Sequence, residues 1–179
     1  KIIRNKKLAE KIVSSNRSES TNKKVIELGI VDESSSDTKK MVKGSDLVII
    51  ATPLSSYQNV LSKIKNSLDK GSILTDVGSV KKNIIDIVEK SIPEGISWIS
   101  SHPIAGTEES GPESGFADLF KSKWCIITPS KKTKEPEIKT LKSFWIKIGS
   151  KVDIMSPEQH DYILSITSHM PHLVAYNIV

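Results

Sequence analysis

The sequence predicts a doubly wound α/β domain, in which helices cover both faces of a parallel sheet. Short, nearly continuous apolar runs recur along the 179 residues, and segments of helical periodicity separate them. This alternation is typical of right-handed βαβ units with buried strands. Polar residues directly follow three of the runs. Because the carboxyl ends of parallel strands share one edge of a sheet, we expect a ligand site at that edge.

The elements follow in order along the chain. The runs predicted as strands span residues 11–16, 46–53, 72–79, 96–103, 124–130 and 151–156. The segments predicted as helices span residues 18–28, 56–68, 79–92, 135–148 and 157–179. Gly29 follows the first helix and Pro93 ends the third, as is typical of helix termini. In the third helix the apolar side chains share one face, which indicates packing against a sheet.

The pattern divides the chain into two parts. Residues 1–155 form the predicted sheet domain, and residues 156–179 begin a helical domain. The chain opens without a methionine and its helical pattern runs to the last residue, so we expect a fragment of a longer protein.

Composition narrows the class of protein. The chain is 37% hydrophobic and 26% charged, and no apolar run approaches the roughly 20 residues of a membrane span. The net charge of +5 comes from scattered lysines, which indicates a solvated surface and anionic small-molecule ligands rather than nucleic acid. A single cysteine, Cys125, lies in an apolar run, so neither disulfides nor a metal site are expected. These features suit a cytoplasmic protein.

His102 is the first candidate for chemistry. It ends the strand at residues 96–103 and begins the stretch "HPIAGTEES". A lone histidine at a strand end often only bonds nearby backbone. Here Ser79 stands at the neighbouring strand end, which predicts a general base with a hydrogen-bonding support. Ser79 is also a suitable N-cap for the next helix, and Gly78 would let a ligand approach the helix N-terminus.

A second group of histidines lies near the end of the chain. His169 and His172 are three residues apart, which places them on about the same face of a helix. A metal pair is less favoured than anion or substrate binding, because Pro171 disturbs the helix and the one acidic partner nearby is in the pair His160–Asp161.

A dinucleotide-binding domain normally begins with a strand, the motif G-x-G-x-x-G and a helix, and this chain contains no such motif. Either the protein binds no dinucleotide, or the motif lies outside this sequence. Residues 1–18 favour the second explanation, since they read as the tail of one helix followed by a second strand. That strand ends at Asn16 and Arg17, where a ribose-reading residue is expected.

Taken together, these motifs resemble the prephenate/arogenate dehydrogenase family of tyrosine biosynthesis. The similarity rests on "DLVIIATP", "TDVGSVK", "SHPIAGTEESGP", "FADLFKSKWCIITP" and "EQHDYILSITSHMPHLVAY" in this order and spacing. The family's glycine-rich motif and most of its helical dimerisation domain are not in the sequence. The resemblance implies a Rossmann-like nucleotide-binding domain over residues 1–155 and the truncated start of the dimerisation domain over residues 156–179.

The resemblance also implies an activity. It is an oxidative decarboxylation, in which the substrate passes a hydride to NAD or NADP, loses carbon dioxide and becomes aromatic. By similarity, His102 accepts a hydrogen bond and then the proton from the substrate hydroxyl. Ser79 would orient His102 and contact the substrate or the nicotinamide. Thr107 and His172 would contact the substrate, with His169 structural. The residues expected to border the cofactor are Asn16, Arg17, Ser18, Thr52, Pro53 and Gly78.

Several alternatives stay open at this point. The residues do not distinguish prephenate from arogenate, and Arg17 favours NADP over NAD only slightly. Another Rossmann-fold hydroxyacid dehydrogenase would use a lysine base, which the histidine motif disfavours. A non-catalytic binding module is the remaining alternative. We expect a homodimer when the protein is complete, and an inactive chain when residues 1–179 stand alone.

Overall fold

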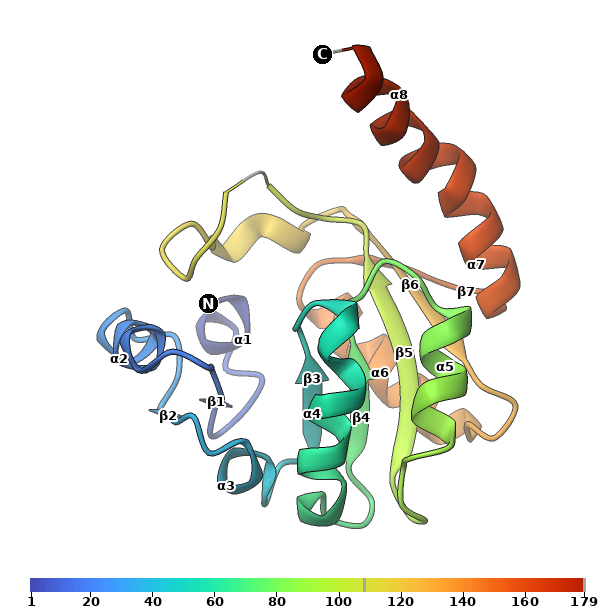
Figure 1. Ribbon diagram of the computed structural model, residues 1–179. Helices are drawn as coiled ribbons and strands as arrows, with labels where there is room; N and C mark the ends of the chain where they lie inside the picture. The colour runs from blue at the N-terminus through green and yellow to red at the C-terminus, as the bar shows by residue number, and fades with distance from the viewer. Residues whose placement is uncertain (108, 179) are drawn as a thin grey trace.

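The main sheet has five strands in the computed structural model, which describes residues 1–107 and 109–178 (Figure 1). Its strands, in spatial order, are β3 (Leu47–Ile50), β4 (Ile73–Asp76), β5 (Ser97–Pro103), β6 (Trp124–Pro129) and β7 (Lys151–Ile154). A separate parallel pair is formed by β1 (Val13–Ser14) and β2 (Glu33–Ser34). All the strands predicted from the apolar runs are present.

One strand pairing departs from the predicted parallel sheet. The pairs β3–β4, β4–β5 and β6–β7 are parallel, whereas β6 runs antiparallel to β5. Between β5 and β6 the chain has a long loop and a short 3₁₀ helix, η3 (Ala117–Phe120), in place of a crossover helix. Parallel neighbours need a crossover, so a connection that stays at one edge returns the chain in the opposite direction. The α/β class with a mostly parallel sheet is confirmed.

The helices follow the predicted order, with shorter spans. They are α1 (Ile2–Asn5), α2 (Glu19–Glu27), α3 (Thr38–Val42), α4 (Tyr57–Ile64), α5 (Lys82–Glu89), α6 (Glu135–Lys147), α7 (Pro157–Leu164) and α8 (Met170–Ile178). Short turns η1 (Leu54–Ser56) and η2 (Lys65–Ser67) flank α4. Helix α1 agrees with the prediction that the first residues form the tail of a helix, whereas the sequence pattern missed α3, which is too short to show a periodic apolar face.

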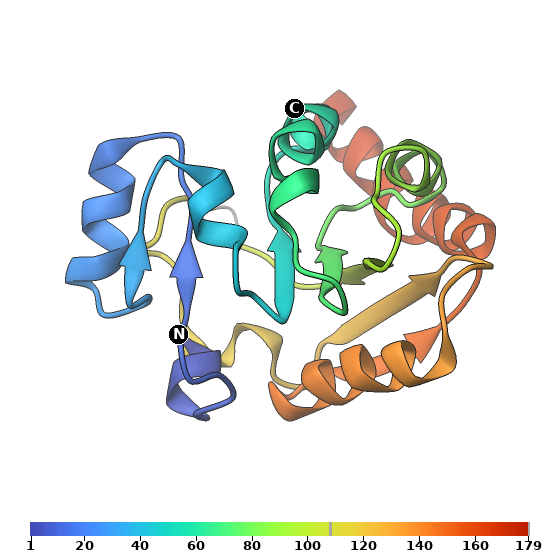
Figure 2. The ribbon, with the colours of Figure 1, turned by 90° about the horizontal axis from the view of Figure 1, so that it is seen from below.

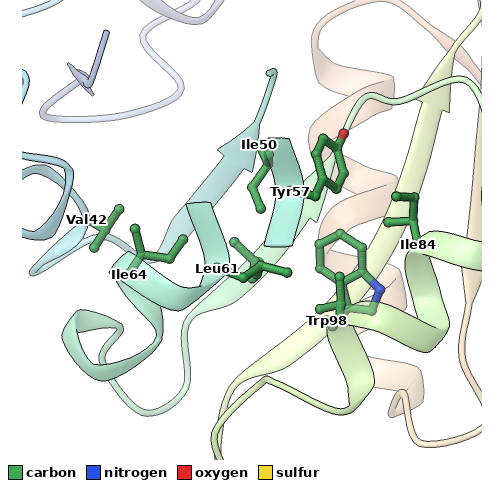
Figure 3. Packing of buried hydrophobic residues seen from close by; sticks show 9 residues of the cluster. Val42, Ile50, Tyr57, Leu61, Ile64, Ile84 and Trp98 are labelled. Carbon is green, nitrogen blue, oxygen red and sulfur yellow. The ribbon is translucent and has the colours of Figure 1, made fainter. Parts of the chain in front are cut away.

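Helices cover both faces of the sheet, and an apolar core lies on each side. Figure 2 shows α4 and α5 on one face and α6 on the other. The first core joins α4 and α5 to the sheet and includes Tyr57, Leu61, Leu74 and Trp98 (Figure 3). The second core packs α6 against the opposite face and contains Ile73, Ile99, Cys125, Ile127, Leu141, Trp145 and Ile148. Neighbouring strand residues alternate between the two cores, as a sheet buried on both faces requires.

The predicted helix over residues 157–179 is interrupted. A π-helical turn, η4 (Ser165–His169), joins α7 to α8 and ends two residues before Pro171. A proline ring clashes with the carbonyl four residues earlier, and a widened turn relieves that clash. Beyond it, α8 extends away from the sheet in Figure 1. Among the described residues, none of the helices combines the length and the hydropathy that crossing a membrane requires.

Candidate active site at the carboxyl ends of the strands

Three polar segments meet at one edge of the sheet. Because β3, β4 and β5 are adjacent and parallel, their carboxyl ends lie side by side. Thr52 and Pro53 follow β3 and are exposed, Ser79 follows β4 and is exposed, and His102 stands at the end of β5. The topology therefore gathers the segments in which the sequence places the candidate site.

His102 is held by a second histidine. Its Nδ1 lies 2.9 Å from Nε2 of His160, whose side chain is fully buried on α7. The His160 Nδ1 in turn lies 2.8 Å from a carboxylate oxygen of Asp161. Burial lowers the pKa of His102 to about 3, and the positive charge of Lys81 adds to the effect. His102 is thus uncharged at neutral pH, as a general base must be.

Ser79 is not the N-cap of helix α5 that the sequence pattern predicted. Helix α5 begins at Lys82, with Lys81 as its N-cap residue, so Ser79 lies outside the helix. The backbone N–H groups of Lys81 and Lys82, which have no partner within the helix, donate to the carboxylate of Asp161 at 2.9 and 3.0 Å. Within the described part of the chain, the side chain that orients His102 is His160. The contact to His102 thus comes from a distant helix, and the expected orienting role of Ser79 stays a prediction.

A buried ion pair lies beneath the site, and the sequence pattern did not reveal it. Lys81 is fully buried and donates from Nζ to Asp76 at 2.8 Å and to the Ser101 carbonyl at 2.7 Å. The Asp76 carboxylate also accepts hydrogen bonds from the Tyr57 hydroxyl, the Gly78 and Ser101 backbone N–H groups and the Ser100 hydroxyl. Burial lowers the pKa of Lys81, and the Asp76 carboxylate opposes that change. The pair fixes the ends of β4 and β5 relative to α4 and α5.

Gly78 is required by packing within the protein. A Cβ atom at this position would lie 2.5 Å from Leu54 Cδ2, 2.9 Å from the Tyr57 hydroxyl and 3.0 Å from Asp76 Oδ2. Figure 3 shows the Tyr57 ring in the first core, close to Ile50. The glycine therefore lets this tyrosine reach Asp76, and its contact with a cofactor stays a prediction.

The turn after β1 holds the residues predicted to read the cofactor ribose. The side-chain Nδ2 of Asn16 donates a hydrogen bond to Asn22 Oδ1 at 3.1 Å, which connects the turn to α2. Ser18 is the N-cap of α2 and accepts a hydrogen bond from the Thr21 backbone N–H. Arg17 stands exposed between them. The turn thus places an exposed arginine directly before a helix N-terminus, a combination suited to an anionic group.

The remaining predicted residues lie apart from this cluster. Thr107 is exposed in the irregular segment after β5, and the neighbouring Glu108 is outside the described residues. His172 is exposed on α8, and the structure gives it no hydrogen bond to His102 in the part that it describes. His169 lies in the π-helical turn, where its charge acts to lower the pKa of both His102 and His160.

Comparison with known proteins decides the family. A profile of the prephenate dehydrogenase nucleotide-binding domain matches residues 1–154. The chain belongs to the prephenate dehydrogenase family. A second profile, for the prephenate dehydrogenase dimerization domain, matches residues 156–179. The family resemblance of the sequence motifs is confirmed.

Relatives within this family extend well beyond the chain. A cyclohexadienyl dehydrogenase from Zymomonas mobilis is 36% identical over 152 residues, which cover 85% of this chain and 52% of the relative. The prephenate dehydrogenase of Bacillus subtilis is 32% identical over 155 residues, or 86% of this chain and 42% of the relative. The chain thus spans about half the length of the curated relatives it matches.

Solved structures show the same fold. The prephenate dehydrogenase from Aquifex aeolicus, in complex with hydroxyphenyl propionate and NAD+, aligns with a TM-score of 0.91 at 32% identity. The alignment covers 98% of this chain and 61% of that one. The arogenate dehydrogenase of Synechocystis aligns with a TM-score of 0.84 at 27% identity, over 93% of this chain and 58% of that one.

Proposed function

We propose that the complete protein carrying this chain is a prephenate or arogenate dehydrogenase of tyrosine biosynthesis that uses NAD or NADP. The observation that carries the proposal is His102, a half-buried and uncharged histidine at the carboxyl end of β5 in a chain of this family. The names of the solved relatives, one of them in complex with NAD+, support the substrate class and the cofactor.

The chain's own residues supply the proton chemistry. The substrate loses a hydride from the ring carbon that bears the hydroxyl and loses carbon dioxide, and the electron pair of the broken C–C bond completes the aromatic ring. His102 accepts a hydrogen bond from that hydroxyl, which stabilises the charge developing on the oxygen as the carbon is oxidised. The fully buried polar groups below His102, among them Asp76 and Lys81, keep its strand end rigid.

The cofactor-binding residues are proposed from the chemistry of their groups. Arg17 and Ser18, beside Asn16, would hold the adenosine end, where a guanidinium group pairs with a 2′-phosphate. Thr52, Pro53 and Gly78 would border the rest of the cofactor at the ends of β3 and β4. When bound, the nicotinamide ring supplies the hydride acceptor. We propose that the enzyme accepts NADP, with a slight preference for it over NAD.

The site also bears on which residues contact the substrate and on whether a lysine could serve as the base. Ser79 and Thr107 are proposed to contact the substrate, together with His172 from the helical part of the complete protein. A related dehydrogenase with a lysine base is disfavoured by a specific observation. Lys81, the buried lysine at this edge, has its Nζ engaged by Asp76 and by the Ser101 carbonyl, so it is not available to a substrate.

We also propose the division into a nucleotide-binding domain over residues 1–155 and the start of a dimerisation domain over residues 156–179. The two profile matches support it. Apolar side chains exposed on α8 support a homodimer, namely Met170, Leu173, Val174, Tyr176 and Ile178. We propose that residues 1–179 alone are inactive, because β1 and β2 are not hydrogen-bonded to the main sheet in the described structure. The predicted cytoplasmic location stays a prediction.

The test is a steady-state assay of the complete protein. Prephenate and arogenate are each offered with NAD and with NADP, and the absorbance of the reduced nicotinamide is followed. We expect turnover of at least one substrate, and none by residues 1–179 alone. If the complete, folded protein turns over neither substrate with either cofactor, the proposed dehydrogenase is refuted in favour of a binding module.

A further inference from the structure

His102 is the end of a chain of hydrogen bonds that starts at the carboxylate of Asp161. This carboxylate has three donors around it, the backbone N–H groups of Lys81 and Lys82 and the Nδ1 of His160. Burial raises the pKa of Asp161, but the hydrogen bonds from Lys82, His160 and Lys81 outweigh it and lower that pKa overall. An ionised carboxylate can only accept hydrogen bonds.

The ionised Asp161 determines which ring nitrogen of His160 carries the proton. Because Asp161 accepts, the proton between the two groups belongs to Nδ1 of His160, at 2.8 Å from the carboxylate oxygen. An unprotonated Nδ1 there would set a lone pair against a negatively charged oxygen. The ring is fully buried, and burial lowers the pKa of His160 despite the opposing effect of Asp161, so the ring carries a single proton. Its Nε2 is therefore an acceptor.

The acceptor nitrogen of His160 determines where the proton of His102 lies. Its Nδ1 lies 2.9 Å from the acceptor Nε2 of His160, so that Nδ1 must carry a proton and donate it. An uncharged imidazole has one N–H group, which leaves the Nε2 of His102 with a free lone pair. We infer that His160 and Asp161 are positioning residues, which hold the proton of His102 on Nδ1 so that its Nε2 accepts the proton of the substrate hydroxyl.

The relay also joins three elements that are distant in sequence. His102 stands on β5, His160 and Asp161 on α7, and the backbone N–H groups that complete the carboxylate shell belong to the start of α5. The helix terminus favours a negative charge at this point, which keeps Asp161 ionised and hence an acceptor. The active tautomer of the base therefore depends on the docking of α7 against α5.

The catalytic part of this inference rests on the proposed function, but the tautomer can be measured without any substrate. The complete protein is labelled with ¹⁵N-histidine, and the long-range nitrogen–proton correlations of its imidazole rings are recorded. Variants at His102 and His160 assign the signals. We expect both rings to be protonated at Nδ1 and unprotonated at Nε2. A proton on Nε2 of His102 at neutral pH would overturn the inference.

Two substitutions of His160 then test the catalytic consequence. His160→Gln keeps a side-chain oxygen that can accept from Nδ1 of His102, whereas His160→Leu removes the acceptor. We expect His160→Leu to lower kcat by about 10²–10⁴, the cost of a misplaced proton on a catalytic histidine, with little change in KM. We expect His160→Gln to restore most of that loss, and its His102 ring to stay protonated on Nδ1.

The control is Glu158→Gln, an exposed residue on the same helix, which should leave kcat unchanged. Equal kcat in wild type and His160→Leu would overturn the inference, and so would an unchanged His102 tautomer in that variant. If His160→Leu does not fold, the wild-type tautomer and the His160→Gln variant still decide. A wild-type protein with the expected tautomer but no turnover of prephenate or arogenate would refute the proposed function and leave the relay standing.

Discussion

Replacing Lys81 by methionine should destabilise the edge of the sheet that carries the site. The lysine side chain is fully buried, and its Nζ lies 2.8 Å from Asp76 and 2.7 Å from the Ser101 carbonyl. The substitution keeps most of the side-chain volume but leaves the carboxylate buried without its countercharge. Removing one partner of a buried ion pair costs about 3–5 kcal/mol. In a unit of this size each kcal/mol lowers Tm by about 2–4 °C.

We therefore expect Lys81→Met to lower the Tm of the complete protein by roughly 6–20 °C, measured by circular dichroism during heating. The neighbouring Lys82→Met is a matched control, because the Lys82 side chain is exposed and the hydrogen bond from its backbone N–H to Asp161 is retained. An exposed substitution of this kind changes stability by about 0.5 kcal/mol or less. Equal Tm values for the two variants would refute the assignment of Lys81 as a structural countercharge.

Three further changes test other parts of the account. Gly78→Ala should lower the free energy of unfolding by about 1–3 kcal/mol in a urea titration, because its Cβ would meet Leu54 and the Tyr57 hydroxyl; an unchanged midpoint would contradict this packing. Arg17→Ala should lower kcat/KM for NADP more than for NAD; an equal loss with both cofactors would exclude a phosphate contact. The pKa of His102 is lowered from 6.5 to about 3, so between these pH values the unfolded state binds more protons than the folded state. The free energy of unfolding therefore falls as the pH drops below 6.5. His102→Gln should reduce the slope of the free energy of unfolding against pH by up to about 1.4 kcal/mol per pH unit. Identical slopes in the wild type and the variant would argue against a neutral His102.

The fold could be predicted well because its signal is local. Each strand of the main sheet is a short apolar run, and the burial of both sheet faces makes such runs nearly continuous. The direction of β6 could not be predicted in this way, since an apolar run carries no information about its orientation. That information lies in the connection from β5, a loop of irregular structure with the 3₁₀ turn η3.

The candidate site was predictable only where its residues follow strands. His102 and the neighbouring strand ends came directly from the pattern. The partners of His102 did not, because His160 is 58 residues away and appeared only in a weak metal motif and in a stretch similar to the family, neither of which links it to His102. Lys81 lies off the apolar face of its predicted helix, a position that indicates exposure, yet the Asp76 carboxylate allows its full burial. Tertiary contacts of this kind leave no periodic signal in a single sequence.

The central claim is that His102 is the base of an oxidative decarboxylation, and the kcat of His102→Asn in the complete protein tests it most directly. The variant is assayed with prephenate and arogenate beside the wild type, and cofactor binding is measured separately. We predict a fall in kcat of about 10²–10⁴ with cofactor binding little changed, the loss typical of a missing general base. A kcat near that of the wild type would contradict the account and leave His102 with a structural role.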